Sequence, residues 1–533
     1  MVNIDEFYSK AITQWQSRNF KEAINLFEKC LKFNPNNPQV LSYVGILELQ
    51  IGKFDEGITK LKQAFKLSPK DKNIKLNLAN AMVDHANYHI KKNSLDIAKE
   101  NLEESIKIFP ENEVAYQNLI KLLIQLKHFK NIEKYFQSLL RLNAKNPEYY
   151  YLFGNSFFDQ CKFNEALSHY RTSENLDPKF VKSIFNQALC YAFLGNYSKS
   201  IEKYDQCLKI EPNYKLALFN KGQLLLENFD YELGWKLYKY RWDLEKNIGK
   251  YIFNPEDELS SKPDFNKKIL VWAEQGVGDQ ILFTSMLADF NDLVKDLTVS
   301  IDNRLRTIYQ RSFPKIKFIN RGERVSNKNF DFHLPMGNLG FFLRKRKEDF
   351  KNQKKQFLFV DENIKNNISK KFINSKKLIC GLSWSSNNEN YGKWKSINFQ
   401  EIAKKISSLN FKFINLEYQN NFDEINEVSK KYNLDFDDTQ NIDKFNDFES
   451  LSALISTCDI VVTISNVTAH FAGALGVKTF LLAPFSFGRF WYWSDESFSK
   501  WYPSVSVIRQ KKQFSWDETI NELVTLLSKH NNN

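Results

Sequence analysis

The sequence predicts an α + α/β protein, in which a helical repeat solenoid precedes two doubly wound, Rossmann-like parallel-sheet domains. In the first half, prolines recur at a regular spacing: Pro35, Pro69, Pro110, Pro178 and Pro212. From residue 267 onward, short β-rich apolar runs alternate with amphipathic segments, which is typical of parallel sheets with right-handed crossovers. The expected parts are a solenoid over 1–242, a linker over 243–266, and two sheet-containing halves over 267–350 and 351–533.

The proline spacing identifies the kind of repeat. The intervals are 34, 41, 68 and 34 residues, and 68 is two periods of 34 with Ala144 at the middle position. The third repeat is therefore about seven residues longer than the others. A period of 34 residues is that of the tetratricopeptide helix–turn–helix unit, so we expect about six and a half such repeats.

Three positions in each repeat support this alignment. We call the five prolines and Ala144 the end positions of the repeats. The residues that stand 24 positions before them are mostly small: Ala11, Gly45, Ala86, Ile120, Gly154 and Ala188. The residues that stand 12 positions before the end positions are Ala23, Gly57, Ala98, Ile132, Ala166 and Ser200. The residues that stand 8 positions before them are large: Phe27, Leu61, Leu102, Phe136, Tyr170 and Tyr204. Small residues let two helices approach closely, and the large residue fills the groove between them. The fourth repeat is degenerate.

Composition limits the partners and the compartment. The formal charge of +12 comes largely from lysine, and a solvated lysine-rich surface is favoured over nucleic-acid or membrane binding because no arginine–aromatic motif is present. The scattered cysteines are expected to be buried thiols, without a disulfide framework or a metal site: Cys30, Cys161, Cys190, Cys207, Cys380 and Cys458. No secretory signal and no apolar run of about 20 residues is visible, which favours a cytoplasmic chain that does not span a membrane.

The second half divides into elements by its apolar runs. We expect strands at 269–273, 297–301, 317–319, 378–383, 411–416, 460–464 and 479–482. We expect helices at 281–294, 399–409, 448–457 and 468–475. A lysine-rich connector over 343–377 contains the run Arg344–Lys347, for which a solvated surface is favoured over an anion site.

The first loop with candidate chemistry is Glu274–Asp279, between a predicted strand and helix. Gly276 and Gly278 allow a tight turn and close approach to a ligand, and the helix N-terminus favours negative charge. Asp279 is either a helix cap or a functional carboxylate. A third spaced glycine is missing, which argues against a dinucleotide fingerprint.

A second loop follows the predicted strand 460–464. Ser465, Asn466 and Thr468 offer capping side chains, and the amides through Ala469 and His470 would form a seat for a diphosphate. The alternative is an ordinary capped helix in which His470 is a core histidine.

The third loop follows the predicted strand 378–383. The hydroxyl of Ser383 and the ammonium of Lys393 suit phosphate oxygens. Lys393 or Lys395 could equally be a surface charge without a role.

These loops, in this order, resemble those of glycosyltransferase family 9, whose best known members are the ADP-heptose:lipopolysaccharide heptosyltransferases. Residues 272–279 resemble the sugar-acceptor loop, and residues 463–476 resemble the nucleotide-phosphate loop and helix. More closely, the chain resembles bacterial proteins that join tetratricopeptide repeats to such a domain, which share Trp501-Tyr502-Pro503 and Arg509-Gln510. The resemblance covers the whole chain and implies a GT-B fold.

The resemblance also implies roles for the loop residues. Asp279 matches the general base, and Gln275, Gly276 and Gly278 belong to the loop around it. The donor side is matched by Ser383, Lys393 and the loop of Ser465, Asn466, Thr468, Ala469 and His470. Many relatives have Asp-Thr or Asp-Ser-Gly where this chain has Ser465-Asn466, which puts a metal-assisted role in doubt.

The implied activity is inverting transfer of a hexosyl or heptosyl group from a nucleotide-diphosphate sugar to a protein or glycan acceptor. No cofactor and no obligatory metal are expected, and the solenoid's concave face would hold a protein partner. One alternative is a catalytically silent tetratricopeptide scaffold for protein–protein interaction, favoured by the Ser465-Asn466 departure. Another is a protein O-glycosyltransferase like the O-GlcNAc transferase, which shares the order of domains.

Overall fold

A computed structural model of the chain describes residues 4–244, 253–260, 266–323, 325–326, 329–372, 375–389, 391–418, 422–494 and 496–531. The chain divides into two compact units, Met1–Cys190 and Tyr191–Asn533. The second unit therefore contains the last predicted repeats as well as both predicted sheets. Within the predicted linker 243–266, Gly249 and Pro263 lie outside the described residues.

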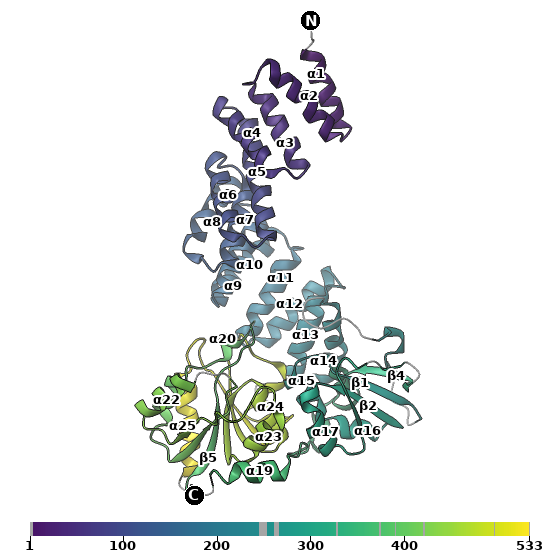
Figure 1. The fold of residues 1–533 in the computed structure, drawn as a ribbon, viewed down its shortest axis with the longest axis vertical. Coiled ribbons are helices and arrows are strands. Elements are labelled where there is room, and N and C mark those ends of the chain that lie inside the picture. Colours follow the sequence, from purple (N-terminus) through teal and green to yellow (C-terminus); the bar gives the residue numbers. More distant parts are fainter. Residues whose placement is uncertain are drawn as a thin grey trace. The chain divides into compact units, whose positions relative to one another are not determined.

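The first unit is built from antiparallel helix pairs that follow one another along the chain (Figure 1). Its helices are α1 (Ile4–Gln16), α2 (Phe20–Phe33), α3 (Pro38–Gln50), α4 (Phe54–Leu67), α5 (Lys72–Lys91), α6 (Leu95–Ile108), α7 (Glu113–Gln125), α8 (Ile132–Asn143), α9 (Pro147–Asp159), α10 (Phe163–Leu176) and the start of α11 (Val181–Phe193). Side chains cap several first helices at their N-termini; Asn37 Oδ1, for example, accepts from the amide of Val40 at 3.1 Å. The predicted helical repeats are confirmed.

Close packing within the pairs explains the small residues of the repeat. A Cβ atom added at Gly45 would lie 2.7 Å from the carbonyl oxygen of Gly57, and one added at Gly154 would lie 2.5 Å from the ring of Tyr170. The large residues at the third repeat position are buried: Phe27, Leu61, Leu102, Phe136, Tyr170 and Tyr204. The predicted division into small contact residues and large filling residues is therefore confirmed.

The extra length of the third repeat is helix. α5 has 20 residues where α3 has 13, a difference of seven. Seven residues are almost two turns of an α-helix, so the longer helix keeps the same face towards its neighbours. The degenerate fourth repeat still forms a pair, α7 and α8, with a short 3₁₀ turn at Phe129–Asn131 before α8.

The second unit begins with the remaining repeats and continues into two parallel sheets (Figure 1). Its repeat helices are the end of α11, α12 (Tyr197–Ile210), α13 (Lys215–Glu227) and α14 (Tyr231–Tyr238), followed by the 3₁₀ helix η2 (Lys239–Asp243). The first sheet contains β1 (Lys268–Trp272), β2 (Asp296–Ile301), β3 (Lys317–Asn320) and β4 (Phe332–Pro335). Its strand order is β3-β2-β1-β4, with every pair parallel.

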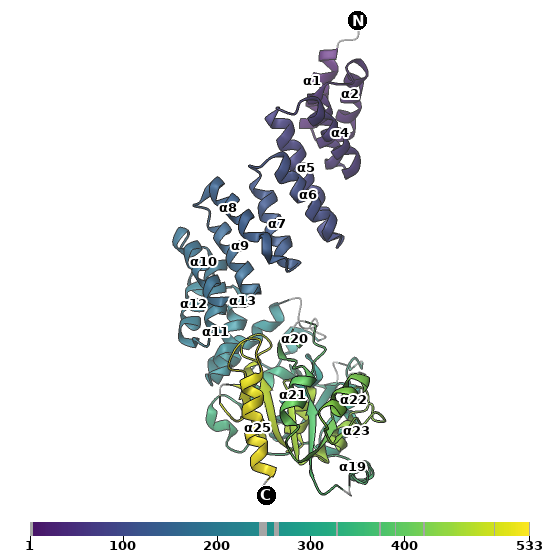
Figure 2. The same ribbon diagram turned by 90° about the vertical axis from the view of Figure 1, so that its left-hand side faces the viewer.

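The second sheet has six parallel strands in the order β10-β9-β8-β5-β6-β7. The strands are β5 (Leu378–Ser383), β6 (Phe411–Asn415), β7 (Phe436–Asp437), β8 (Ile460–Ile464), β9 (Lys478–Ala483) and β10 (Val505–Arg509). On one face, α21 (Phe399–Ile406) and α25 (Asp517–Asn531) lie side by side (Figure 2). On the other, α23 (Phe448–Ser456) and α24 (Val467–Ala474) belong to the core that also contains the first sheet.

The other helices of this unit are α15 (Val277–Thr284), α16 (Leu287–Asn291), α17 (Arg306–Ser312), α18 (Leu339–Leu343), α19 (Glu362–Ser369), α20 (Gly392–Lys395) and α22 (Phe422–Lys431). The parallel sheets expected from the sequence are present. The single helix expected over 281–294 is wrong, because α15 ends at Thr284 and α16 starts at Leu287. Strands β4, β7 and β10 were not predicted.

The basic run in the connector is neutralised by its surroundings. Arg344 is buried and donates to Asp289 at 2.9 Å, and Lys347 pairs with Glu496 at 2.6 Å. Arg346 Nη2 lies 3.7 Å from Asp349 Oδ1. Three of the four basic residues of this run therefore form ion pairs with acidic side chains. The expected solvated surface is wrong for Arg344, which is buried.

The expected burial of the cysteine thiols is confirmed for five of the six. Cys161 is half-buried, and the other five cysteines are buried. None of the helices among the described residues combines the length and the apolar character needed to cross a membrane.

Gly45→Ala is expected to destabilise the first unit by about 1–3 kcal/mol, because the added methyl group meets the carbonyl of Gly57. The loss should appear even though alanine favours helix by about 1 kcal/mol over glycine. Thermal unfolding followed by helical circular dichroism measures the change, with exposed Thr59→Ala in the paired helix as control. Equal melting of the two variants would contradict the close approach of α3 and α4.

Candidate functional site

The predicted site loops lie where the strand order of each sheet reverses. In the first sheet the order reverses between β1 and β4, and the loop after β1 carries Gln275–Asp279. In the second it reverses between β5 and β8, whose C-terminal ends carry Ser383 and Ser465. Ligands of open parallel sheets bind outside the carboxyl ends of strands at such points. Because α15 and α24 are in contact, the loops of the two sheets come together.

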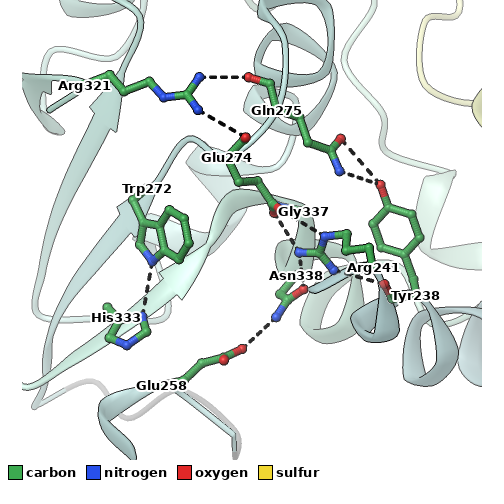
Figure 3. A network of polar contacts seen from close by, with 10 residues as sticks. All are labelled: Tyr238, Arg241, Glu258, Trp272, Glu274, Gln275, Arg321, His333, Gly337 and Asn338. Atoms are coloured by element: carbon green, nitrogen blue, oxygen red, sulfur yellow. Dashed lines mark hydrogen bonds and ion pairs between the residues drawn. The ribbon is translucent and has the colours of Figure 1, made fainter. Parts of the chain in front are cut away.

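A buried ion pair anchors the loop after β1 to the end of the repeats (Figure 3). Arg241 in η2 donates from Nε to Glu274 Oε2 at 2.7 Å and from Nη2 to Glu274 Oε1 at 2.6 Å. Arg241 is 1% exposed and Glu274 is 5% exposed. Tyr238, at the end of α14, accepts a hydrogen bond from Gln275 Nε2 at 3.0 Å. The last repeat therefore holds two consecutive residues of the loop.

The segment after β4 completes this network. The amide of Gly337 donates to Glu274 Oε1 at 2.7 Å, and Arg241 Nη2 donates to Asn338 Oδ1 at 2.6 Å (Figure 3). A Cβ atom at Gly337 would lie 2.6 Å from Glu274 Oε1, so a side chain there would push the carboxylate out of its present position. Buried charges persist when they are paired and hydrogen-bonded, as here. Sequence reasoning missed Arg241, which lies 33 residues before its partner.

Asp279 lies in the first turn of α15 and is half-buried. Gly276 is the N-cap residue, so the capping interpretation of Asp279 is wrong in its simple form. Burial raises the pKa of Asp279 to about 6, and the nearby carboxylate of Glu274 adds to the rise. The amide of Gly276 and the ammonium of Lys395 act in the opposite direction. A carboxyl group with this pKa can exchange a proton near neutral pH.

The lysine next to Asp279 is Lys395 rather than Lys393. Lys395 is 5% exposed and donates from Nζ to the carbonyl of Ser465 at 2.7 Å. Burial lowers the pKa of Lys395 to about 8, against the opposing effect of Asp279. Lys393 is exposed and lies over the ring of Trp394, with Nζ 4.3 Å from the centroid. Both lysines belong to the four-residue helix α20, and the sequence did not distinguish them.

The N-terminus of α24 contributes the residues of the second predicted loop, which lies against α15. Asn466 is its N-cap, accepting from the amide of Ala469 at 3.3 Å and donating to Ser383 Oγ at 2.8 Å. The hydroxyl of Ser465 accepts from the indole of Trp493 at 2.8 Å. Thr468 is 3% exposed, so its side chain is buried with the helix.

His470 is a packed histidine. Its Nδ1 lies 2.9 Å from the hydroxyl of Tyr502, and burial lowers its pKa to about 3. A Cβ atom at Gly278 would lie 2.8 Å from the His470 ring, which shows how closely α15 approaches α24. The neutral ring of His470 therefore supports the contact between the two sheets' loops, which matches the core-histidine alternative.

Glu417, which sequence reasoning missed, holds the loop after β5. It is 1% exposed and accepts hydrogen bonds from the hydroxyl of Ser383 at 3.0 Å, from the amide of Ser385 at 2.8 Å and from the amide of Trp384. Of these groups, the hydroxyl of Ser383 is the one expected from the sequence to meet a phosphate. In the described structure an internal carboxylate occupies that anion position. Glu417 follows β6 without any local motif, so no sequence signal marked it.

No three His, Cys, Asp or Glu side chains gather into a group that could hold a metal ion in the part of the chain that the structure describes.

Two segments match models of the tetratricopeptide repeat, residues 7–37 and 181–214. Together with the helix pairs, these matches establish an N-terminal tetratricopeptide solenoid. They lie near the two ends of the predicted repeat region, which agrees with the 34-residue period.

Among curated proteins, the chain is 23% identical to protein FlbA of Caulobacter vibrioides over 409 residues, covering 72% of this chain and 67% of FlbA. Residues 1–242 are less than half of the chain, so this match extends beyond the repeats. It is 24% identical to Hsp70-Hsp90 organizing protein 1 of Glycine max over 230 residues, covering 42% of this chain. The chain spans only about two fifths (39%) of that relative's length. Neither relative is named as a glycosyltransferase.

Similar solved structures are tetratricopeptide proteins. YrrB, a TPR protein with an unusual peptide-binding site, is 22% identical with a TM-score of 0.31, covering 37% of this chain and 97% of YrrB. The C-terminal part of a TPR repeat-containing protein from Cytophaga hutchinsonii is 15% identical with a TM-score of 0.37, covering 45% of this chain and 95% of that one.

Asp279→Asn is expected to raise the stability of the second unit at neutral pH. The rise in pKa from 3.8 to about 6 means that charging Asp279 opposes folding by roughly 3 kcal/mol. The folded state retains its proton between these values, so the favourable contribution is complete below pH 3.8 and is lost as the pH rises through about 6.

The gain from Asp279→Asn should therefore be present at pH 7 and disappear near pH 4. Urea unfolding of the wild type and the variant across this range measures it. A variant that is destabilised equally at every pH would show that burial does not raise the pKa of Asp279.

Proposed function

We propose that the chain is a protein-interaction scaffold whose repeats bind an extended segment of a protein partner. A set of half-buried asparagines on the first helices of the repeats carries this proposal. Asn77, Asn118, Asn186 and Asn220 each lie eight residues after an end position of the repeat. The same residue type thus recurs with the period of the fold at four of its six equivalent positions, the other two being Tyr43 and Leu152.

These asparagines join successive first helices. In the first unit, Asn77 donates to Ser42 at 3.0 Å, Asn118 donates to Asn87 at 3.1 Å, and Asn186 donates to Asn155 at 2.8 Å. Each pair links a first helix to the first helix of the preceding repeat.

The first helices line the inner side of the solenoid. Among the described helices α3 to α9, successive first helices contact one another closely, whereas successive second helices do not. Stacked repeats curve towards the side on which their helices are closer, so the asparagine row lies on the concave face. Each amide has both a donor and an acceptor, which suits the N–H and C=O groups of an extended peptide.

Replacing Asn77, Asn118 and Asn186 together by alanine is expected to weaken partner binding strongly while the solenoid stays helical. Each hydrogen bond lost to a partner is worth about 1 kcal/mol, so three should reduce affinity by roughly 100-fold. The assay is quantitative mass spectrometry of proteins retained by the immobilised full chain. Alanine at Asn25, Asn164 and Asn175, exposed on second helices, is the matched control. Equal loss in both variants would contradict the proposal.

A second candidate is glycosyl transfer in the α/β part, favoured by Asp279 with its pKa near 6 beside Lys395. An acceptor hydroxyl would lose its proton to Asp279 while its oxygen bonds to the anomeric carbon. The bond from that carbon to the nucleotide diphosphate would break, inverting the configuration. Lys395 and the N-terminus of α24 are the groups suited to the leaving diphosphate.

The bonds of Glu417 are the main objection to this candidate. A donor phosphate at Ser383 and the amides of Trp384 and Ser385 would have to displace a buried carboxylate that already accepts from them. Such a donor would therefore have to bind closer to Lys395 and Ser465 than the resemblance implies.

If the second candidate holds, Asp279→Asn should reduce sugar transfer, or donor hydrolysis, by about 10²- to 10⁴-fold with little change in donor affinity. Calorimetry with UDP, ADP and GDP measures affinity, and Lys395→Met should weaken it more than Lys393→Met. Unchanged turnover in Asp279→Asn would remove this residue from the mechanism. Absence of nucleotide binding in the folded protein would leave the scaffold function alone.

A further inference from the structure

Two histidines near the end of α5 have no role in either proposed function. α5 is the helix that is seven residues longer than α3, and His85 and His89 lie in its last two turns. Residues four apart on a helix project from the same face and can bind one ligand together.

The two imidazoles face each other. His85 Nε2 lies 2.9 Å from His89 Nε2, and at most one of two nitrogens at this distance carries a proton. At least one bare lone pair therefore points into the space between them. His85 Nδ1 lies 3.3 Å from Asn101 Oδ1 on α6, so this ring holds its proton on Nδ1 and presents Nε2 as an acceptor.

The surroundings hold both rings in place. Phe54 stacks on His85 with 5.8 Å between ring centroids, and burial, with the neighbouring His85, lowers the pKa of His89. Asp55, in the first turn of α4, places Oδ1 3.8 Å from His85 Nε2, and its side chain is 94% exposed. A carboxylate beside the facing nitrogens of two imidazoles creates an electronegative position between α4 and α5.

We propose that His85 and His89 bind a divalent transition-metal ion such as Zn²⁺ through their Nε2 atoms. Two nitrogens on a tetrahedral zinc ion, each at 2.0–2.1 Å, lie about 3.3 Å apart, so small rotations of the side chains are sufficient. The described residues contain no closed three-ligand group, so this is an open site completed by water. The exposed carboxylate of Asp55 can turn towards the ion.

The ion would act as a clip between repeats. Asp55 belongs to the second helix of one repeat, and the histidines belong to the first helix of the next (Figures 1 and 2). A ligand shared between them fixes α5 against α4, close to the start of the asparagine row. The hydrogen bond that His85 Nδ1 donates to Asn101 Oδ1 would orient His85, as the partners of metal-bound histidines commonly do.

Calorimetric titration of the metal-free full chain with ZnCl₂ tests this site. We expect one saturable Zn²⁺ per chain, and no binding of Mg²⁺, which prefers oxygen ligands. His85→Gln and His89→Gln should each weaken Zn²⁺ binding at least 10- to 100-fold, and Asn101→Ala should weaken it by about 10-fold. His128→Gln, at an exposed histidine of the same solenoid, should bind as the wild type does.

Circular dichroism of each variant establishes that the helices are retained. Zinc should also raise the melting temperature of the wild type and not that of His85→Gln or His89→Gln. Equal Zn²⁺ affinity in the wild type and in the double variant of His85 and His89 would overturn the proposal. So would a wild type without saturable binding, which would leave the pair as a hydrogen bond between two rings.

Discussion

The second unit depends on the buried ion pair between Arg241 and Glu274. Two charges removed from water are costly, and loss of one partner of such a pair typically costs about 3–5 kcal/mol. Here every strong group is satisfied, by Gly337, Asn338 and a bidentate contact at 2.6 and 2.7 Å. Arg241 follows the last repeat, and Glu274 begins the loop after β1. This one interaction therefore fixes that loop to the end of the repeats.

The same constraint explains where the two units meet in the sequence. Trp235 of α14 donates to the carbonyl of Arg344 at 2.8 Å and packs edge-on against Trp491, with 5.3 Å between ring centroids. A Cβ atom at Gly340 would overlap the Trp235 ring. Repeats bound this tightly to the sheets share one core with them, so the boundary falls at Tyr191, inside the repeats, rather than at the end of the period near residue 242.

Patterns with a period were predictable, and contacts between distant segments were not. Burial at Gly45 or Tyr170 follows from the repeat, and the loops that carry Asp279 and Ser465 follow from the alternation of strands and helices. Lys395 could not be preferred over Lys393, because a four-residue helix has too few residues for its buried face to be recognised. Arg241 and Glu417 meet their partners only after the chain folds, 33 and 34 residues away.

The pKa shifts at Asp279 and Lys395 bear on whether these loops have a function of their own. Burial raises the pKa of Asp279 and lowers that of Lys395, so both charged forms are disfavoured in the folded chain. A scaffold gains nothing from such a pair, since apolar residues of similar size are often as stable or more stable. Strained polar groups of this kind cluster at functional sites, where the cost in stability is balanced by chemistry or binding. The contacts of Glu417 are evidence against such a function, because its carboxylate already accepts the hydrogen bonds of Ser383 and Ser385. Burial of Asp279 and Lys395 therefore argues for the second candidate function, whereas the hydrogen bonds of Glu417 argue against a diphosphate seated at Ser383.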